Sequence, residues 1–113
     1  MDSVSEFIEK KEVINRKQIA IDFANSLNHK EIEKIILFGS VVRGEDNEES
    51  DIDILIITTD EDKIEDEVYR KVMDFLLKTM VYISAKIIPI KDYEKFKNLP
   101  FFVNVAKEGV IIG

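Results

Sequence analysis

The sequence contains no cysteine, and this absence removes several kinds of chemistry at once. Without a thiol the chain can form no disulfide, no thiolate zinc site and no cysteine nucleophile. Basic residues are also outnumbered: 16 lysines and arginines stand against 23 aspartates and glutamates, so the formal net charge is −7. Because the excess of basic charge that binds nucleic-acid phosphates is missing, we expect no nucleic-acid partner.

Long apolar runs are missing as well. No stretch approaches the roughly 18 to 20 apolar residues that a membrane helix needs, and the opening MDSVSEFIEKKEV is charged and lacks the apolar centre of a signal segment. We therefore expect a cytoplasmic protein without membrane contact. No repeat, low-complexity tract or linker divides the chain. With 113 residues, of which 45% are hydrophobic, the sequence predicts one folded domain over residues 1–113.

Hydrophobic periodicity predicts alternating helices and strands, because helical spacing and short β-branched runs follow one another along the chain. In chain order the expected elements are one long helix or two abutting ones at 4–27, strands at 32–38 and 51–59, a helix capped by Asp60, a strand within 80–90, short helices at 91–97 and 100–108, and a short strand at 110–112. The expected fold class is a small α/β (α+β) domain, in which helices flank a mixed β-sheet.

Two aspartates open the second predicted strand, directly before a run of aliphatic residues. Side chains alternate along a strand, so Asp51 and Asp53 lie on one face with Cα atoms about 6 to 7 Å apart. Two like charges at a covered sheet resist desolvation unless a cation lies between them. Mg²⁺ takes one or two protein carboxylates and completes its coordination with water and substrate phosphates. The pair predicts a magnesium site, with up to two ions if the reaction is an in-line phosphoryl displacement.

Gly39-Ser40, at the end of the first predicted strand, supplies complementary chemistry. A glycine lets the backbone approach a ligand, and the amides of a following helical turn can point at an anion. Ser40 adds a hydroxyl, and Arg43 can present a planar cation to a phosphate. Taken singly, an Asp-x-Asp pair is usually a surface feature, a Gly-Ser pair a turn, and an acidic run such as 45–49 a solvated loop. Their order along the chain favours a phosphate site that faces a metal site.

Together these residues resemble a known family. Gly39-Ser40, ten intervening residues and Asp51-Ile52-Asp53 match the GS-x10-DxD signature of the nucleotidyltransferase superfamily related to DNA polymerase β. The longer segment GSVVRGEDNEESDIDILI is similar to the minimal nucleotidyltransferases of prokaryotes, and AKEGVII resembles their usual ending. The resemblance covers essentially the whole chain and implies the palm-like nucleotidyltransferase fold of polymerase β.

The resemblance also implies an activity and a set of site residues. It implies Mg²⁺-dependent transfer of a nucleoside monophosphate, AMP from ATP, to a hydroxyl. Many members act as antitoxins of a HEPN-domain ribonuclease, so the implied acceptor is a tyrosine of a HEPN toxin in a type VII-like pair, within a homo- or hetero-oligomer. Gly39, Ser40 and Arg43 would bind the nucleotide. Asp51 and Asp53 would bind the metal and be the catalytic residues.

The third predicted strand departs from the family pattern. Active members of the superfamily usually carry a third carboxylate there, whereas VYISAKI contains no acid and Ser84 is the residue expected at that position. Three outcomes stay open: two carboxylates and water suffice, a partner completes the site, or nucleotide binds without turnover. The alternative function is therefore a weak or inactive nucleotide-binding module that neutralises or regulates a partner by direct binding. A regulatory nucleotide-binding domain without a toxin partner is a further alternative.

Overall fold

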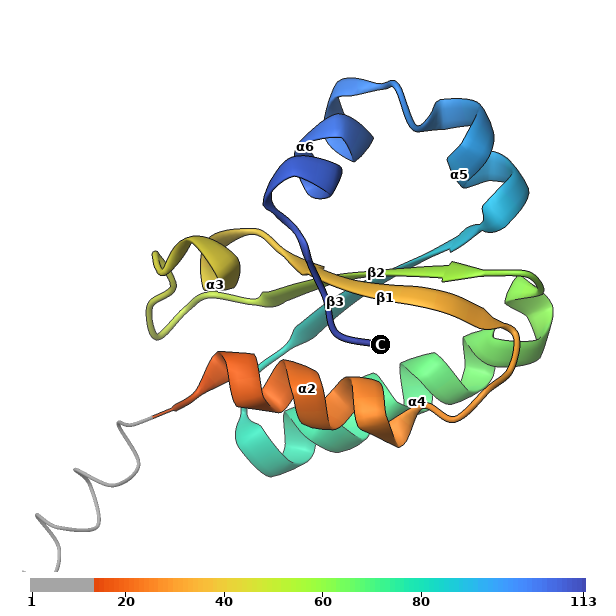
Figure 1. The fold of residues 1–113 in the computed structure, drawn as a ribbon. Coiled ribbons are helices and arrows are strands. Elements are labelled where there is room, and N and C mark those ends of the chain that lie inside the picture. The colour runs from red at the N-terminus through yellow and green to blue at the C-terminus, as the bar shows by residue number, and fades with distance from the viewer. Residues whose placement is uncertain (1–13) are drawn as a thin grey trace, which may run out of the picture.

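The structure, a computed structural model, describes residues 14–113 (Figure 1). The elements of this part of the chain follow the predicted order with one addition, because the segment that links the first two strands contains a short helix. They are α2 (Arg16–Ser26), β1 (Ile32–Phe38), α3 (Ser40–Arg43), β2 (Ile52–Thr58), α4 (Glu61–Thr79), β3 (Ile83–Pro89), α5 (Ile90–Phe96), α6 (Pro100–Glu108) and β4 (Val110–Ile111).

The strands form one mixed sheet in the order β3-β2-β1-β4. β1 runs antiparallel to β2 and to β4, whereas β2 and β3 run parallel and are connected through α4. A parallel connection needs a crossover of a dozen or more residues, which the 19-residue α4 provides. β2 is therefore an inner strand, and any side chain at its start has a neighbouring strand on each side.

Helices cover both faces of the sheet, α2 and α4 on one side and α5 and α6 on the other (Figure 1). The alternation of β2 explains this arrangement. Ile52, Ile54 and Ile56 pack in the cluster that includes α2 and α4, while Leu55 and Ile57 pack in the cluster that includes Val105 and Phe102 of α6. With a period of two, the side chain of Asp53 belongs to the face that α6 covers.

The expected fold class is confirmed, and two details of the helices differ from the prediction. Of the two forms expected for 4–27, the single helix is wrong, because Asn15 is extended (φ −96°, ψ 91°) and its side chain accepts the Gln18 N–H at the start of α2. Two abutting helices stay a prediction, since residues 4–13 lie outside the described part of the chain. Asp60 does occupy the position before α4, but its side chain makes no capping hydrogen bond.

Within residues 14–113 no helix is long and apolar enough to cross a membrane.

Candidate active site

Gly39 brings the end of β1 against the start of β2. Its φ of 82° lies in a region that favours glycine. A Cβ at this position would also collide with the side chain of Asp53, which would have to shift to admit it. Phe38 pairs with Asp53 in the antiparallel ladder, which fixes this approach. The structure thus brings together the Gly-Ser and Asp-x-Asp elements that the sequence separates by ten residues.

The residues after Gly39 form a single helical turn, α3. Val42 and Arg43 donate their backbone N–H groups to the Gly39 carbonyl at 3.1 and 3.2 Å, and Gly44 ends the turn in the left-handed region at φ 72°. Ser40 is half-buried at the beginning of this turn, and the side chain of Arg43 is 45% exposed at its end. Gly39, Ser40 and Arg43 therefore share one short turn beside Asp53, as the sequence predicted.

The two aspartates differ in their surroundings. Asp53 is half-buried within β2, whereas Asp51 is exposed and lies one residue before the strand begins. Burial raises the pKa of the Asp53 carboxyl above its ordinary value; the positive charge of Lys86 opposes this shift, and the negative charge of Asp51 adds to it. Smaller effects come from Arg43, which lowers the Asp53 pKa, and from Glu108, which raises it. Negative charge at Asp53 is thus incompletely compensated.

This donor set fits a hard divalent cation. Asp51 and Asp53 offer carboxylate oxygens close enough to influence one another's charge, and a cation between them would relieve both the repulsion and the desolvation of Asp53. Among residues 14–113 there is no group of three or more histidine, aspartate or glutamate side chains placed to hold a metal. The protein's own contribution would be two carboxylates, which is the number that Mg²⁺ commonly takes.

Ser84 lies where the sequence analysis placed the missing acid. It pairs directly with Asp53 across the parallel ladder of β2 and β3, so the two side chains are neighbours on one face. Lys86, two residues further along β3, lies on the same face and lowers the Asp53 pKa. β3 therefore brings a hydroxyl and a cation to this site, and no carboxylate.

Glu108 is a site residue that sequence reasoning missed. Its Oε1 accepts hydrogen bonds from the Gly39 N–H and from Nη1 of Arg43, both at 3.1 Å. Arg43 also donates from Nε to Glu45 at 2.8 Å, and the two carboxylates raise the Arg43 pKa, Glu45 more than Glu108. The last residue of α6 thus contacts two of the three residues predicted to bind nucleotide. Its separation of 69 residues from Gly39 hides it from any local pattern.

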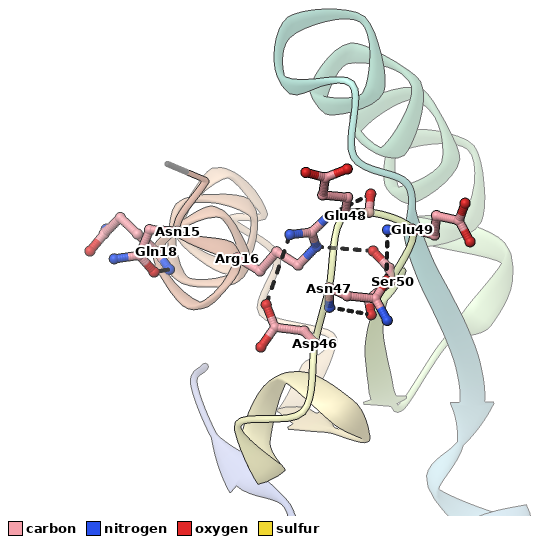
Figure 2. A network of polar contacts seen from close by, with 8 residues as sticks. All are labelled: Asn15, Arg16, Gln18, Asp46, Asn47, Glu48, Glu49 and Ser50. Carbon is pink, nitrogen blue, oxygen red and sulfur yellow. Dashed lines mark hydrogen bonds and ion pairs between the residues drawn. The ribbon is translucent and has the colours of Figure 1, made fainter. Parts of the chain in front are cut away.

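The loop between α3 and β2 is more ordered than a solvated acidic run (Figure 2). Asp46 faces the guanidinium of Arg16, which also binds the Glu48 and Ser50 carbonyls. The expectation of plain solvation is therefore wrong for Asp46. Glu45 pairs with Arg43 but stays exposed, and Glu48 and Glu49 also have exposed side chains as expected.

A cavity of about 350 Å³ lies elsewhere, between the end of α2 and β1. Asn25, Asn28 and His29 are among its lining residues, and neither aspartate of the site contributes to it. The candidate active site is thus defined by the meeting of the turn after β1 with the start of β2.

A four-stranded mixed sheet that brings this turn beside this aspartate pair is the arrangement that the resemblance to nucleotidyltransferases implies, and comparison with known proteins agrees. Residues 17–113 match the family described as Polymerase beta, Nucleotidyltransferase, and the chain belongs to that family. A protein of Methanocaldococcus jannaschii, named as a candidate protein adenylyltransferase, is 39% identical over 102 residues, covering 88% of this chain and 99% of that one.

A solved structure shares the fold. One chain of a crystal structure described as a toxin-antitoxin with AMP-PNP aligns over 88% of this chain and 73% of that chain, with a TM-score of 0.55 and 18% sequence identity. At this identity the similarity concerns the fold.

Proposed function

We propose that this protein transfers AMP from ATP to a hydroxyl group, with Mg²⁺, and that the acceptor is a tyrosine of a HEPN-domain toxin that it neutralises. Membership of the nucleotidyltransferase family supports the reaction type, and the relative named as a candidate protein adenylyltransferase supports AMP and a protein acceptor. The toxin-antitoxin description of the structural neighbour supports a toxin as the partner. The cytoplasm remains the expected compartment.

The observation that carries the proposal is the contact between Gly39 and Asp53. Gly39 lies so close to the Asp53 side chain that a Cβ on Gly39 would collide with it. The predicted phosphate turn and the predicted metal carboxylate are therefore neighbours. In this assignment Gly39 and Ser40 hold the triphosphate. The Ser40 amide and hydroxyl bind it, and Gly39, whose own N–H donates to Glu108, lets the backbone approach it, while Arg43 neutralises phosphate charge. Asp51 and Asp53 would hold Mg²⁺, which when bound stabilises the charge that develops on the phosphates.

The proposed reaction is an in-line displacement at the α-phosphorus. The acceptor oxygen forms a bond to the α-phosphorus, the bond from that phosphorus to the oxygen bridging to the β-phosphorus breaks, and pyrophosphate leaves with the electron pair. The acceptor loses its proton to water, because β3 carries a serine and no carboxylate beside Asp53. The chain's own residues then act by positioning and charge compensation.

A second candidate is the binding module that neutralises a partner without turnover. Two observations favour it: β3 supplies no carboxylate, and Arg43 is already engaged by Glu45 and Glu108. In this case nucleotide would bind weakly or serve as a regulatory ligand, and the partner would be inhibited by stoichiometric contact.

One experiment separates the two candidates. The protein is incubated with Mg²⁺, ATP labelled at the α-phosphate and the product of the neighbouring gene, and both label transfer and complex formation are measured for the wild type, Asp51→Asn and Asp53→Asn. An enzyme labels the partner, and both substitutions abolish the label. A binding module forms a complex that survives both substitutions, and the partner stays unlabelled; that result would refute the proposed transfer.

A further inference from the structure

Arg16, the first residue of α2, is almost enclosed by the protein. Only 6% of its surface is exposed, although arginine is rarely buried unless it is paired. Its hydrogen-bond partners lie 32 and 34 residues further along the chain. Such a residue has a role that α2 alone does not explain.

All three guanidinium nitrogens of Arg16 reach the loop that leads into β2 (Figure 2). Nε donates to the Ser50 carbonyl at 3.0 Å, Nη2 donates to the Glu48 carbonyl at 3.1 Å, and Nη1 lies 3.8 Å from Oδ2 of Asp46. Two of these contacts are made to the backbone, so they fix the path of the chain more than they neutralise its acids. A lysine, with a single ammonium group, cannot reproduce this fork.

The loop also closes on itself. The Asn47 N–H donates to Oγ of Ser50, and the Glu49 N–H donates to Oδ1 of Asn47, both at 2.8 Å. The Ser50 N–H donates to the Asn47 carbonyl at 3.1 Å. Arg16 therefore binds a compact turn, and a turn fixed in this way also constrains the backbone of the residue that follows it.

That residue is Asp51. The Ser50 carbonyl, which Arg16 binds, belongs to the peptide that joins Ser50 to Asp51. The next peptide is fixed on its other side, because the Ile52 N–H donates to the Tyr82 carbonyl at 3.0 Å. Since Asp51 precedes β2, these two anchored peptides fix the backbone from which its side chain projects.

We infer that Arg16 is a positioning residue, which sets the carboxylate of Asp51 for a divalent cation through the Ser50 carbonyl. The inference rests on the proposed role of Asp51 as a metal ligand. Residues that orient a metal ligand typically change metal affinity or activity 10- to 100-fold when they are replaced.

The test measures binding of Mn²⁺, a stand-in for Mg²⁺ with oxygen ligands, by the electron paramagnetic resonance signal of the free ion. For Arg16→Lys we expect Mn²⁺ affinity to fall by roughly tenfold. Lys17→Gln, an exposed charge on the same helix, and Val72→Ala, a buried position of α4 that lowers stability, should both bind Mn²⁺ as the wild type does.

A kinetic readout separates positioning from general damage. In Arg16→Lys the Mg²⁺ concentration for half-maximal AMP transfer should rise by the same factor, while the rate at saturating Mg²⁺ stays near that of the wild type. If folded Arg16→Lys instead shows a lower rate at every Mg²⁺ concentration, with the half-maximal Mg²⁺ concentration unchanged, the inference is overturned.

The outcomes distinguish this inference from the proposed function. If Asp51→Asn weakens Mn²⁺ binding and Arg16→Lys does not, the role of Arg16 is refuted and the metal site stands. If Asp51→Asn and Asp53→Asn both bind Mn²⁺ as the wild type does, the metal site is refuted and the inference falls with it. Should Arg16→Lys fail to fold, the exposed Asn47→Ala loosens the same turn from within, and unchanged Mn²⁺ affinity in that variant overturns the inference.

Discussion

The two aspartates of the Asp-x-Asp pair are only two residues apart, yet different parts of the molecule hold them. Asp53 lies within β2, paired with Phe38 on one side and with Ser84 on the other. Asp51 is exposed and precedes the strand, and Arg16 anchors the peptide before it. The sheet therefore holds Asp53, whereas the buried Arg16 of α2 holds the backbone that leads to Asp51.

This difference teaches that one short motif can depend on two separate supports. A residue within the sheet is held by many backbone hydrogen bonds and by buried neighbours. Single side-chain changes therefore shift it little, unless they disrupt the pairing of the strands. A position outside the ladder depends on a few specific contacts. The following predictions test whether the two aspartates respond separately.

Removal of either carboxylate should have the largest effect. We expect Asp51→Asn and Asp53→Asn each to lower AMP transfer by roughly 100-fold or more, since a lost metal ligand weakens the charge stabilisation on which phosphoryl chemistry depends. Steady-state label transfer measures this. Glu49→Gln, an exposed acid of the loop before Asp51, is the matched control and should retain wild-type activity.

Gly39→Ala should disturb Asp53, the aspartate that the sheet holds, and should leave Asp51 in place. The new Cβ would meet Oδ2 of Asp53 in a backbone with φ 82°, so we expect a loss of roughly 1 to 3 kcal/mol in the free energy of unfolding together with weaker Mn²⁺ binding. Gly44→Ala is a control for a positive φ without collision, because Gly44 lies in the left-handed region (φ 72°, ψ 22°) and its Cβ would meet nothing within 4 Å. Gly39 (φ 82°, ψ −156°) lies outside that region, so its variant carries the larger backbone strain as well as the collision. Equal Mn²⁺ affinities in the two variants would refute the role of the close approach.

Glu108→Gln should change nucleotide binding to a smaller extent. The substitution removes one of the two negative charges that engage Arg43, and an exposed ion pair contributes little because water and salt screen it. We expect ATP to bind up to about fivefold tighter, since Arg43 becomes freer to meet a phosphate. Glu94→Gln, which breaks the exposed Glu94–Lys97 pair, is the control. Weaker ATP binding in Glu108→Gln would show instead that Glu108 supports the phosphate turn.

The smallest expected effect concerns stability and pH. Because burial raises the folded-state pKa of Asp53 above its unfolded value, the folded state holds this proton more tightly, and stability is lost as pH rises through the interval between the two values. Asp53→Asn should therefore gain stability relative to the wild type as pH rises through that interval, and the gain should level off above it. Urea unfolding at a series of pH values measures this; a gain that is independent of pH would contradict the burial of a charged carboxylate.

Local patterns were sufficient to predict most of the fold and the centre of the site. Apolar runs ended by Gly39 and opened by Asp51 gave the first two strands to within a residue of β1 and β2. The alternation of β2 placed Asp53 on a definite face. Ser84 was predicted beside the site and does pair with Asp53, because a parallel strand in this register brings the two together.

The supporting residues could not be predicted, because their contacts depend on how distant elements pack. Glu108 reaches Gly39 only because α6 returns across the sheet, and Arg16 reaches Ser50 only because α2 lies beside the loop. The acidic run at 45–49 has the composition of a solvated loop, and nothing local marks Asp46 as the partner of a buried arginine. Tertiary structure decides which charges of such a run are paired.

The most direct test of the proposed function compares two labels of ATP in one assay. With Mg²⁺ and the partner protein, the account predicts that label from the α-phosphate appears on the partner while label from the γ-phosphate leaves as pyrophosphate. Transfer of the γ label to the partner would show a kinase. Absence of both labels from the partner, under conditions where the two proteins form a complex, would contradict nucleotidyl transfer.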